Sequence, residues 1–242
     1  MSVMHVEPAR TPRERRRQAN YRKIIDAAID IVVSGGFEAL SMGRLAKEID
    51  YTAGALYRYF SGKDALIVAM TARVIHDFAD VLGRAAGLVP ADAPLQRVLV
   101  LPLAYRDLAA AAPQRFGLIS MLLATPRMLV EDAEEAAPAM EAITIALAPL
   151  AVALEEAREV GALQFTGGAP EHAVVAFGAV HGLLQLRKQR ERVPTLFDLD
   201  GLVRTSVRSL LLGWAADPAA LDAALDTVIA RGDLVAAAGG MP

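Results

Sequence analysis

Cysteine is absent from all 242 residues, which excludes disulfides, thiol catalysis and cysteine-ligated zinc. Alternating strand patterns and hairpin signals are also missing, so the apolar periodicity favours helices almost throughout. The sequence contains no serine-hydrolase elbow, zinc-protease helix, dinucleotide-binding loop or Walker loop. His172 and His181 are nine residues apart, on opposite sides of a helix, which disfavours a shared metal. We therefore expect an all-α protein that is not an enzyme and has no cofactor or metal.

Long hydrophobic runs are scarce, although apolar residues make up 54% of the chain. The longest, 142–154 and 173–186, fall short of the ~20 residues of a membrane-spanning helix. Pro149 interrupts the first run. No secretory signal is apparent, because the basic stretch 10–17 is followed by an amphipathic segment. We expect a soluble cytoplasmic protein without a membrane partner, whose apolar residues form a core and a subunit interface.

Charge is divided unevenly along the chain, which has a net charge of −3. Residues 1–64 carry 11 Lys or Arg and 8 Asp or Glu, whereas the remainder carries 14 and 20. A basic first quarter on an acidic remainder is typical of a DNA-contacting module joined to a partner-binding or sensor domain.

Helix stop signals predict the organisation of the chain. We expect a flexible basic arm over 1–17, a DNA-binding unit over 18–78, a ligand-binding and dimerisation domain over 79–231, and a flexible tail over 232–242. Glycine pairs and prolines mark the predicted breaks. The expected helices cover about 18–33, short stretches after Ser41 and Thr52, 62–87, 95–111, 114–124, 138–160, 170–191, 198–215 and 218–231.

The segment 41–63 predicts a helix-turn-helix. Met42, Leu45, Ala46 and Ile49 form one apolar stripe, and Thr52 is a suitable N-cap for the next short helix. In that helix Leu56 and Phe60 would face inward. The opposite side carries almost no side chain at its start, so its backbone could approach a phosphate-lined groove.

The outward side of this segment carries the candidate DNA contacts. A cation in the first turn of a helix opposes its macrodipole at a cost of about 0.3–1 kcal/mol, so Lys63 favours a phosphate contact there. Tyrosine hydroxyls could bind phosphate, and Arg58 could hold a guanine edge. For each residue an ordinary surface or half-buried side chain is the alternative, and for Arg13–Arg17 a flexible terminus is preferred over a minor-groove arm. The candidates are Ser41, Arg44, Thr52, Ala53, Gly54, Tyr57, Arg58, Tyr59 and Lys63.

Residues 18–78 resemble the TetR/AcrR family of bacterial transcriptional repressors. The resemblance rests on Ile24-x-x-Ala27-Ala28, Gly36-Phe37, Ser41-x-x-x-Leu45-Ala46 and Thr52-x-Gly54-x-Leu56-Tyr57-x-Tyr59-Phe60-x-x-Lys63-x-x-Leu66. It implies that Thr52, Ala53, Gly54, Tyr57, Tyr59 and Lys63 touch DNA. Asp50-Tyr51 stands where Gly-Val is usual, which leaves the turn geometry open, and Tyr59 stands where histidine is common.

The resemblance also implies a helical C-terminal domain that senses a ligand and dimerises. Two apolar helix faces near the chain end are candidates for the interface, with an intramolecular core as the alternative: Ala173, Val180, Leu184, Leu199, Leu202, Val203, Ser206, Leu210, Gly213 and Trp214. Candidates for the ligand pocket, or plain core, are Tyr105, Phe116, Met121, Met140, Phe177 and His181. Because few aromatic residues follow residue 64, we prefer an aliphatic pocket for a lipophilic molecule.

The expected function is a homodimeric repressor that leaves its double-stranded DNA operator when a small-molecule effector binds. The alternative is a DNA-binding regulator that senses no small molecule and is controlled by a protein or acts constitutively.

Overall fold

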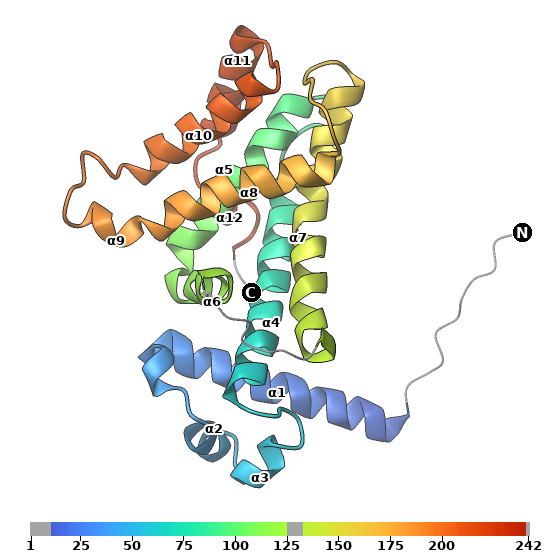
Figure 1. Cartoon of the computed structure of the whole chain (residues 1–242), viewed down its shortest axis with the longest axis vertical. Coiled ribbons are helices and arrows are strands. Elements are labelled where there is room, and N and C mark those ends of the chain that lie inside the picture. The colour runs from blue at the N-terminus through green and yellow to red at the C-terminus, as the bar shows by residue number, and fades with distance from the viewer. Residues whose placement is uncertain (1–10, 125–132, 241–242) are drawn as a thin grey trace, which may run out of the picture. The chain divides into compact units, whose positions relative to one another are not determined.

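The computed structural model describes residues 11–124 and 133–240, and chain contacts divide the molecule into two units, Met1–Met70 and Thr71–Pro242. The described residues form helices and no strand, which confirms the expected all-α class (Figure 1). The boundary between the units falls inside one long helix, after Met70, whereas the sequence pattern placed it after residue 78.

The N-terminal unit is a small helical bundle. Its elements are α1 (Pro12–Gly35), the 3-10 turn η1 (Phe37–Ala39), α2 (Met42–Glu48), α3 (Ala53–Leu56) and the first residues of α4 (Lys63–Ala86). Five residues predicted to face inward are at most 4% exposed: Leu45, Ala46, Ile49, Leu56 and Phe60. Met42 of the predicted stripe is only half-buried, and the core also contains Ile25, Ile29 and Leu40, which the pattern did not single out. The hydrophobic period therefore predicted most of the short helices' contribution to this core.

The basic segment before residue 18 is helical, so the prediction of a flexible arm is wrong from Pro12 onward. Thr11 caps α1: its hydroxyl accepts from the Glu14 amide at 3.3 Å, and the Glu14 carboxylate accepts from the Thr11 amide at 2.7 Å. This capping box, with Pro12 at the first helical position, starts the helix there. Residues 1–10 lie outside the described part of the chain.

The C-terminal unit is built around α5, which contacts α6, α7, α8, α10, α11 and α12 (Figure 1). Its helices are the part of α4 from Thr71 onward, α5 (Pro94–Ala111), α6 (Pro113–Ala124), α7 (Ala133–Glu159), α8 (Ala169–Gln185), α9 (Arg187–Arg190), α10 (Leu199–Gly213), α11 (Pro218–Ile229) and α12 (Leu234–Ala237). The predicted helix over 170–191 is two helices, which divide at Leu186.

The tail after Gly232 is ordered, in contrast to the prediction. Leu234 and Val235 of α12 are buried against α5, and Asp233 caps this short helix. Arg84 of α4 donates to the carbonyl oxygens of Ala238 at 2.8 Å and Gly240 at 2.9 Å. These contacts hold a segment whose small residues alone predict fraying.

One described stretch, Ala137–Glu159 in α7, has the length and mean hydropathy (1.8) of a membrane-spanning helix, with 28% of its most apolar window buried. The sequence pattern gave a shorter run, 142–154, which Pro149 was expected to interrupt, but α7 continues through this proline. Since α7 packs against α5 and α8, length and composition alone do not make it a membrane segment.

Candidate functional site

The turn between α2 and α3 keeps a regular helix-ending geometry. Asp50 adopts a φ of 59°, in the left-handed region that aspartate tolerates better than most residues. The amides of Tyr51 and Asp50 donate back to the carbonyl oxygens of Ala46 at 2.8 Å and Lys47 at 3.4 Å, which is a Schellman ending. Asp50 therefore makes the turn where the resembling family has glycine.

Helix α1 fixes this turn and the segment that follows α3. Lys23 donates to the Ile49 carbonyl at 3.3 Å, and its ammonium lies 5.5 Å from the centre of the Tyr51 ring. Asn20 donates to the Tyr59 hydroxyl at 3.3 Å. These positioning residues of α1 have no signature in the apolar spacing, so the sequence pattern did not reveal them.

The predicted N-cap Thr52 is confirmed, and Ser41 caps the preceding short helix in the same way. The Ser41 hydroxyl accepts from the Arg44 amide at 3.1 Å, and the Thr52 hydroxyl accepts from the Ala55 amide at 3.2 Å. Because each oxygen acts as the acceptor, its own hydrogen remains available to another acceptor. Both residues are exposed, so each could donate to a phosphate oxygen.

The face of α3 opposite Leu56 is open. Ala53 and Gly54 are exposed, and neither amide has a hydrogen-bond acceptor in the described part of the chain. A Cβ added to Gly54 would meet nothing within 4 Å, and its φ is not in the left-handed region. Since the fold does not require glycine here, the missing side chain favours close approach by a ligand.

The larger candidates surround this open turn at different exposures. Tyr57 is 54% exposed. Arg44, Arg58 and Lys63 are exposed, and none has an ion-pair partner among residues 11–124 and 133–240. Lys63 is the first residue of α4, as the sequence predicts, and opposes the macrodipole of a 24-residue helix. Tyr59 differs, because it is half-buried and bonded to Asn20.

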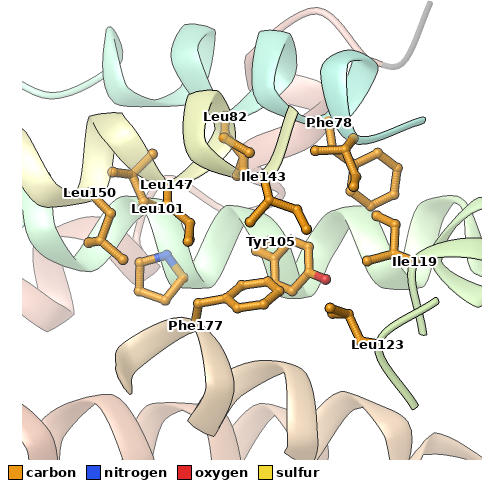
Figure 2. Close-up of a pocket in the computed structure, with 13 residues that line it drawn as sticks. Phe78, Leu82, Leu101, Tyr105, Ile119, Leu123, Ile143, Leu147, Leu150 and Phe177 are labelled. Carbon is orange, nitrogen blue, oxygen red and sulfur yellow. The ribbon is translucent and has the colours of Figure 1, made fainter. Parts of the chain in front are cut away.

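An apolar cavity of about 70 Å³ lies in the C-terminal unit. Figure 2 shows its side chains converging from α4, α5, α6, α7 and α8. The lining residues are Ile75, Phe78, Leu82, Leu101, Pro102, Tyr105, Ile119, Leu123, Ile143, Ala146, Leu147, Leu150 and Phe177. The lining contains two of the six predicted residues, Tyr105 and Phe177.

The other four predicted pocket residues lie elsewhere. Phe116 and His181 are buried behind the cavity wall, Met140 is 53% exposed, and Met121 does not line the cavity. The sequence pattern missed all three lining residues of α4, and two of them, Ile75 and Phe78, lie before the predicted domain boundary after residue 78.

Tyr105 and His181 form a buried polar pair beside the cavity. The Tyr105 hydroxyl lies 2.8 Å from His181 Nδ1, and His181 Nε2 is buried without a partner in the described structure. Burial, and secondarily the Arg187 guanidinium, lowers the pKa of His181 to about 4. Burial also raises the pKa of Tyr105. Both groups are therefore neutral at pH 7.

The predicted interface residues divide into two groups. Five are buried within the protomer at 8% exposure or less, and the structure assigns them to the core: Ala173, Val180, Leu184, Leu199 and Val203. The others are half-buried or exposed on α10 and just after it: Leu202, Ser206, Leu210, Gly213 and Trp214. On α8 the exposed apolar residues are instead Val174 (54%) and Val175 (51%), beside Gly178 and Gly182.

These features define a helix-turn-helix protein with a second, all-helical unit. Residues 24–70 match the family model described as bacterial regulatory proteins, tetR family. This match, together with the relatives below, shows that the helix-turn-helix segment is similar to that of TetR-family regulators. The named relatives are transcriptional repressors and regulators.

The relatives match only part of this chain. The transcriptional repressor KstR of Mycolicibacterium smegmatis is 36% identical over 86 residues, which are 36% of this chain and 39% of that protein. The chain thus matches about two fifths of that relative's length.

Solved structures share the fold at low identity. A Rhodococcus protein of unknown function superposes with a TM-score of 0.62 at 21% identity, over 89% of this chain and 100% of that one. The regulator FadR of Bacillus subtilis, in complex with stearoyl-CoA, gives 0.60 at 16% identity, over 79% and 97%.

Proposed function

We propose that this protein is a DNA-binding transcriptional repressor that acts in the cytoplasm. The observation that carries the proposal is the exposed face of α3, where packing does not require the glycine at Gly54. The capping hydroxyls of Thr52 and, on α2, Ser41 each retain a hydrogen that can be donated. The exposed cations Arg44, Arg58 and Lys63 border that face. Phosphate oxygens would accept from the hydroxyls and amides, and Arg58 would read a base edge in the major groove.

The proposed active species is a homodimer. Two copies of α3 would enter successive major grooves of a pseudo-palindromic operator, about 34–36 Å apart. The interface we propose uses the exposed apolar side of α8, at Val174 and Val175, and the accessible part of α10, at Leu202 and Leu210. Apolar surface of this kind is stabilised by burial against a second copy.

A small lipophilic effector would occupy the apolar cavity. Its lining is almost entirely hydrocarbon, and the similarly folded FadR was solved with stearoyl-CoA. Ligand pockets generally measure about 300–1,000 Å³. At about 70 Å³ the cavity must therefore enlarge around a ligand.

Enlargement of the cavity would act on α4. Phe78 of α4 lines the cavity, and the adjacent Asp77 accepts from Arg115 of α6 at 3.0 Å. Because α4 starts at Lys63, a displacement would reach the DNA-contacting end of this helix. Emptying the operator requires the ligand to favour the displaced state by a few kcal/mol.

The test begins with selection of bound fragments from the host genome by the full-length protein. Gel-shift titration should then show saturable binding of a fragment with an inverted repeat, and a lipophile such as oleate or a sterol should release it. Failure to retain any fragment over random DNA would refute the proposal.

The regulator without a small-molecule ligand is the second candidate, favoured by the small size of the cavity. Thermal-shift measurements with the same lipophiles distinguish the two. A rise in melting temperature that Ala146→Trp abolishes supports the sensor, whereas operator binding without any such rise supports the second candidate.

A further inference from the structure

A second and much larger cleft lies in the C-terminal unit. Its volume is about 700 Å³, and it lies between α5, the start of α6, the end of α8, α9 and the start of α10. This volume falls in the range of about 300–1,000 Å³ typical of small-molecule sites. Unlike the apolar cavity, its lining is charged, with Arg106, Arg187, Lys188 and Arg190 against Glu191 and Asp200.

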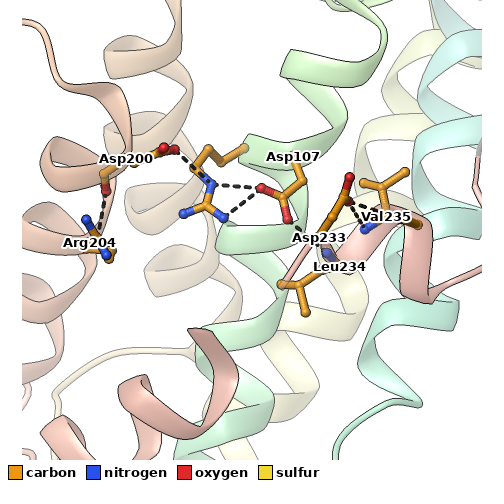
Figure 3. Close-up of polar contacts among 8 residues, drawn as sticks. Asp107, Asp200, Arg204, Asp233, Leu234 and Val235 are labelled. Carbon is orange, nitrogen blue, oxygen red and sulfur yellow. Dashed lines mark hydrogen bonds and ion pairs between the residues drawn. The ribbon is translucent and has the colours of Figure 1, made fainter. Parts of the chain in front are cut away.

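Arg106 is neutralised by the protein itself. Its guanidinium nitrogens lie 2.6 Å from a carboxylate oxygen of Asp107 and 3.4 Å from one of Asp200 (Figure 3). The second ion pair joins α5 to the start of α10. Asp107 also accepts from the Leu234 amide at 3.0 Å. This network connects one wall of the cleft to α10 and to the start of α12.

The remaining three cations are unpaired. Arg187, Lys188 and Arg190 have no carboxylate partner among residues 11–124 and 133–240. They lie in a part of the chain where acidic residues outnumber basic ones, 20 to 14. The cleft therefore carries a local excess of positive charge that no carboxylate of the described structure offsets.

Arg187 is held in place by an aromatic ring. Its guanidinium lies 5.0 Å from the centre of the Phe116 ring. This cation–π contact holds the guanidinium beside the cleft, and its N–H groups can donate to two oxygens of one anion.

We propose that this cleft binds a small molecule that carries phosphate or carboxylate groups, held by Arg187, Lys188 and Arg190. Arg187 supplies paired donors from a fixed plane, and the exposed Lys188 and Arg190 supply mobile positive charge.

The cleft also borders the aromatic cluster beside the apolar cavity. The Phe116 ring, under Arg187, lies 5.1 Å from His181 and 6.0 Å from Tyr105, which lines that cavity. The anionic group therefore has two possible sources. It belongs to a separate anion, or it is the head of a molecule whose apolar part reaches the cavity after the aromatic side chains move.

The test is isothermal titration calorimetry of the full-length protein with inorganic pyrophosphate, dodecyl phosphate and dodecanol. We expect at least one phosphate probe to bind with a Kd below about 1 mM. Lys188→Glu/Arg190→Glu should weaken its binding at least tenfold. The control variant Arg192→Glu/Arg231→Glu makes the same charge change at exposed residues outside the cleft. Its affinity for the phosphate probe should stay within twofold of the wild-type value.

The probes also distinguish the source of the anion. Equal affinity for pyrophosphate and dodecyl phosphate supports a separate anion, whereas tighter binding of dodecyl phosphate that Ala146→Trp weakens supports a single amphiphile. If charge reversal impairs folding, Lys188→Ala/Arg190→Ala replaces it and should likewise bind the phosphate probe more weakly than the wild type and the control variant do. No binding of either phosphate probe, or equal weakening by the cleft and control variants, overturns the proposal whether or not the protein binds DNA.

Discussion

Gly54→Ala should change stability and DNA binding in opposite directions. The new methyl group meets nothing within 4 Å in the protein, and the glycine φ is not in the left-handed region. Alanine is favoured over glycine in helices by about 0.5–1 kcal/mol, so the free energy of unfolding should rise by up to that amount. The same methyl group would stand between α3 and the DNA backbone. We expect operator affinity to fall at least tenfold, or about 1.4 kcal/mol.

Gly43→Ala is a matched control for this prediction. Gly43 is the second residue of α2, as Gly54 is of α3; both are exposed, and a Cβ at Gly43 also meets nothing within 4 Å. The stability of the Gly43→Ala variant should rise similarly, while its operator affinity should stay within about twofold of the wild-type value. Chemical denaturation and fluorescence anisotropy with a labelled operator measure the two quantities. Equal operator affinity for Gly54→Ala and the wild type would refute a close approach of α3 to DNA.

Three further predictions concern specificity, pH and the cavity. Arg58→Ala should change which bases are preferred and reduce the discrimination at one operator position by about 1–3 kcal/mol. Binding to a library of mutated operators measures this change, and a uniform loss of affinity across the library would contradict base readout. Because burial lowers the pKa of His181 from 6.5 to about 4, the unfolded state binds more protons between these values. Stability should therefore fall by up to about 3 kcal/mol as pH drops from 6.5 to 4, and His181→Gln should reduce this slope in pH-dependent denaturation; an unchanged slope would contradict it. Ala146→Trp should fill the apolar cavity and abolish stabilisation by lipophiles, and intact stabilisation would exclude this cavity as the effector site.

Local chemistry made the helix-turn-helix predictable from sequence. The hydroxyls of Ser41 and Thr52 satisfy amides three residues on, so their capping role follows from position alone. The inward residues Leu45 and Leu56 follow from the helical period. Even the departure at Asp50 has a local explanation, since aspartate tolerates the left-handed turn.

Tertiary packing decided what the sequence pattern could not. Both sides of α8 are apolar, so the helical period could not determine that Ala173 and Val180 face the core while Val174 and Val175 face outward. The apolar cavity draws side chains from five helices, and its lining depends on how those helices cross. The order of the C-terminal tail likewise depends on Arg84, which is more than 150 residues distant in sequence from its partners.

The salt dependence of operator binding tests the central claim most directly. For the wild-type protein, log affinity should fall linearly with log salt concentration. Lys63→Ala should reduce the magnitude of this slope by about one unit, because one phosphate contact is lost. Lys188→Ala, which removes an exposed lysine from the C-terminal unit, should leave the slope unchanged. Salt-insensitive binding by the wild type, or equal slopes for Lys63→Ala and the wild type, would contradict a phosphate-bound N-terminal unit anchored by Lys63.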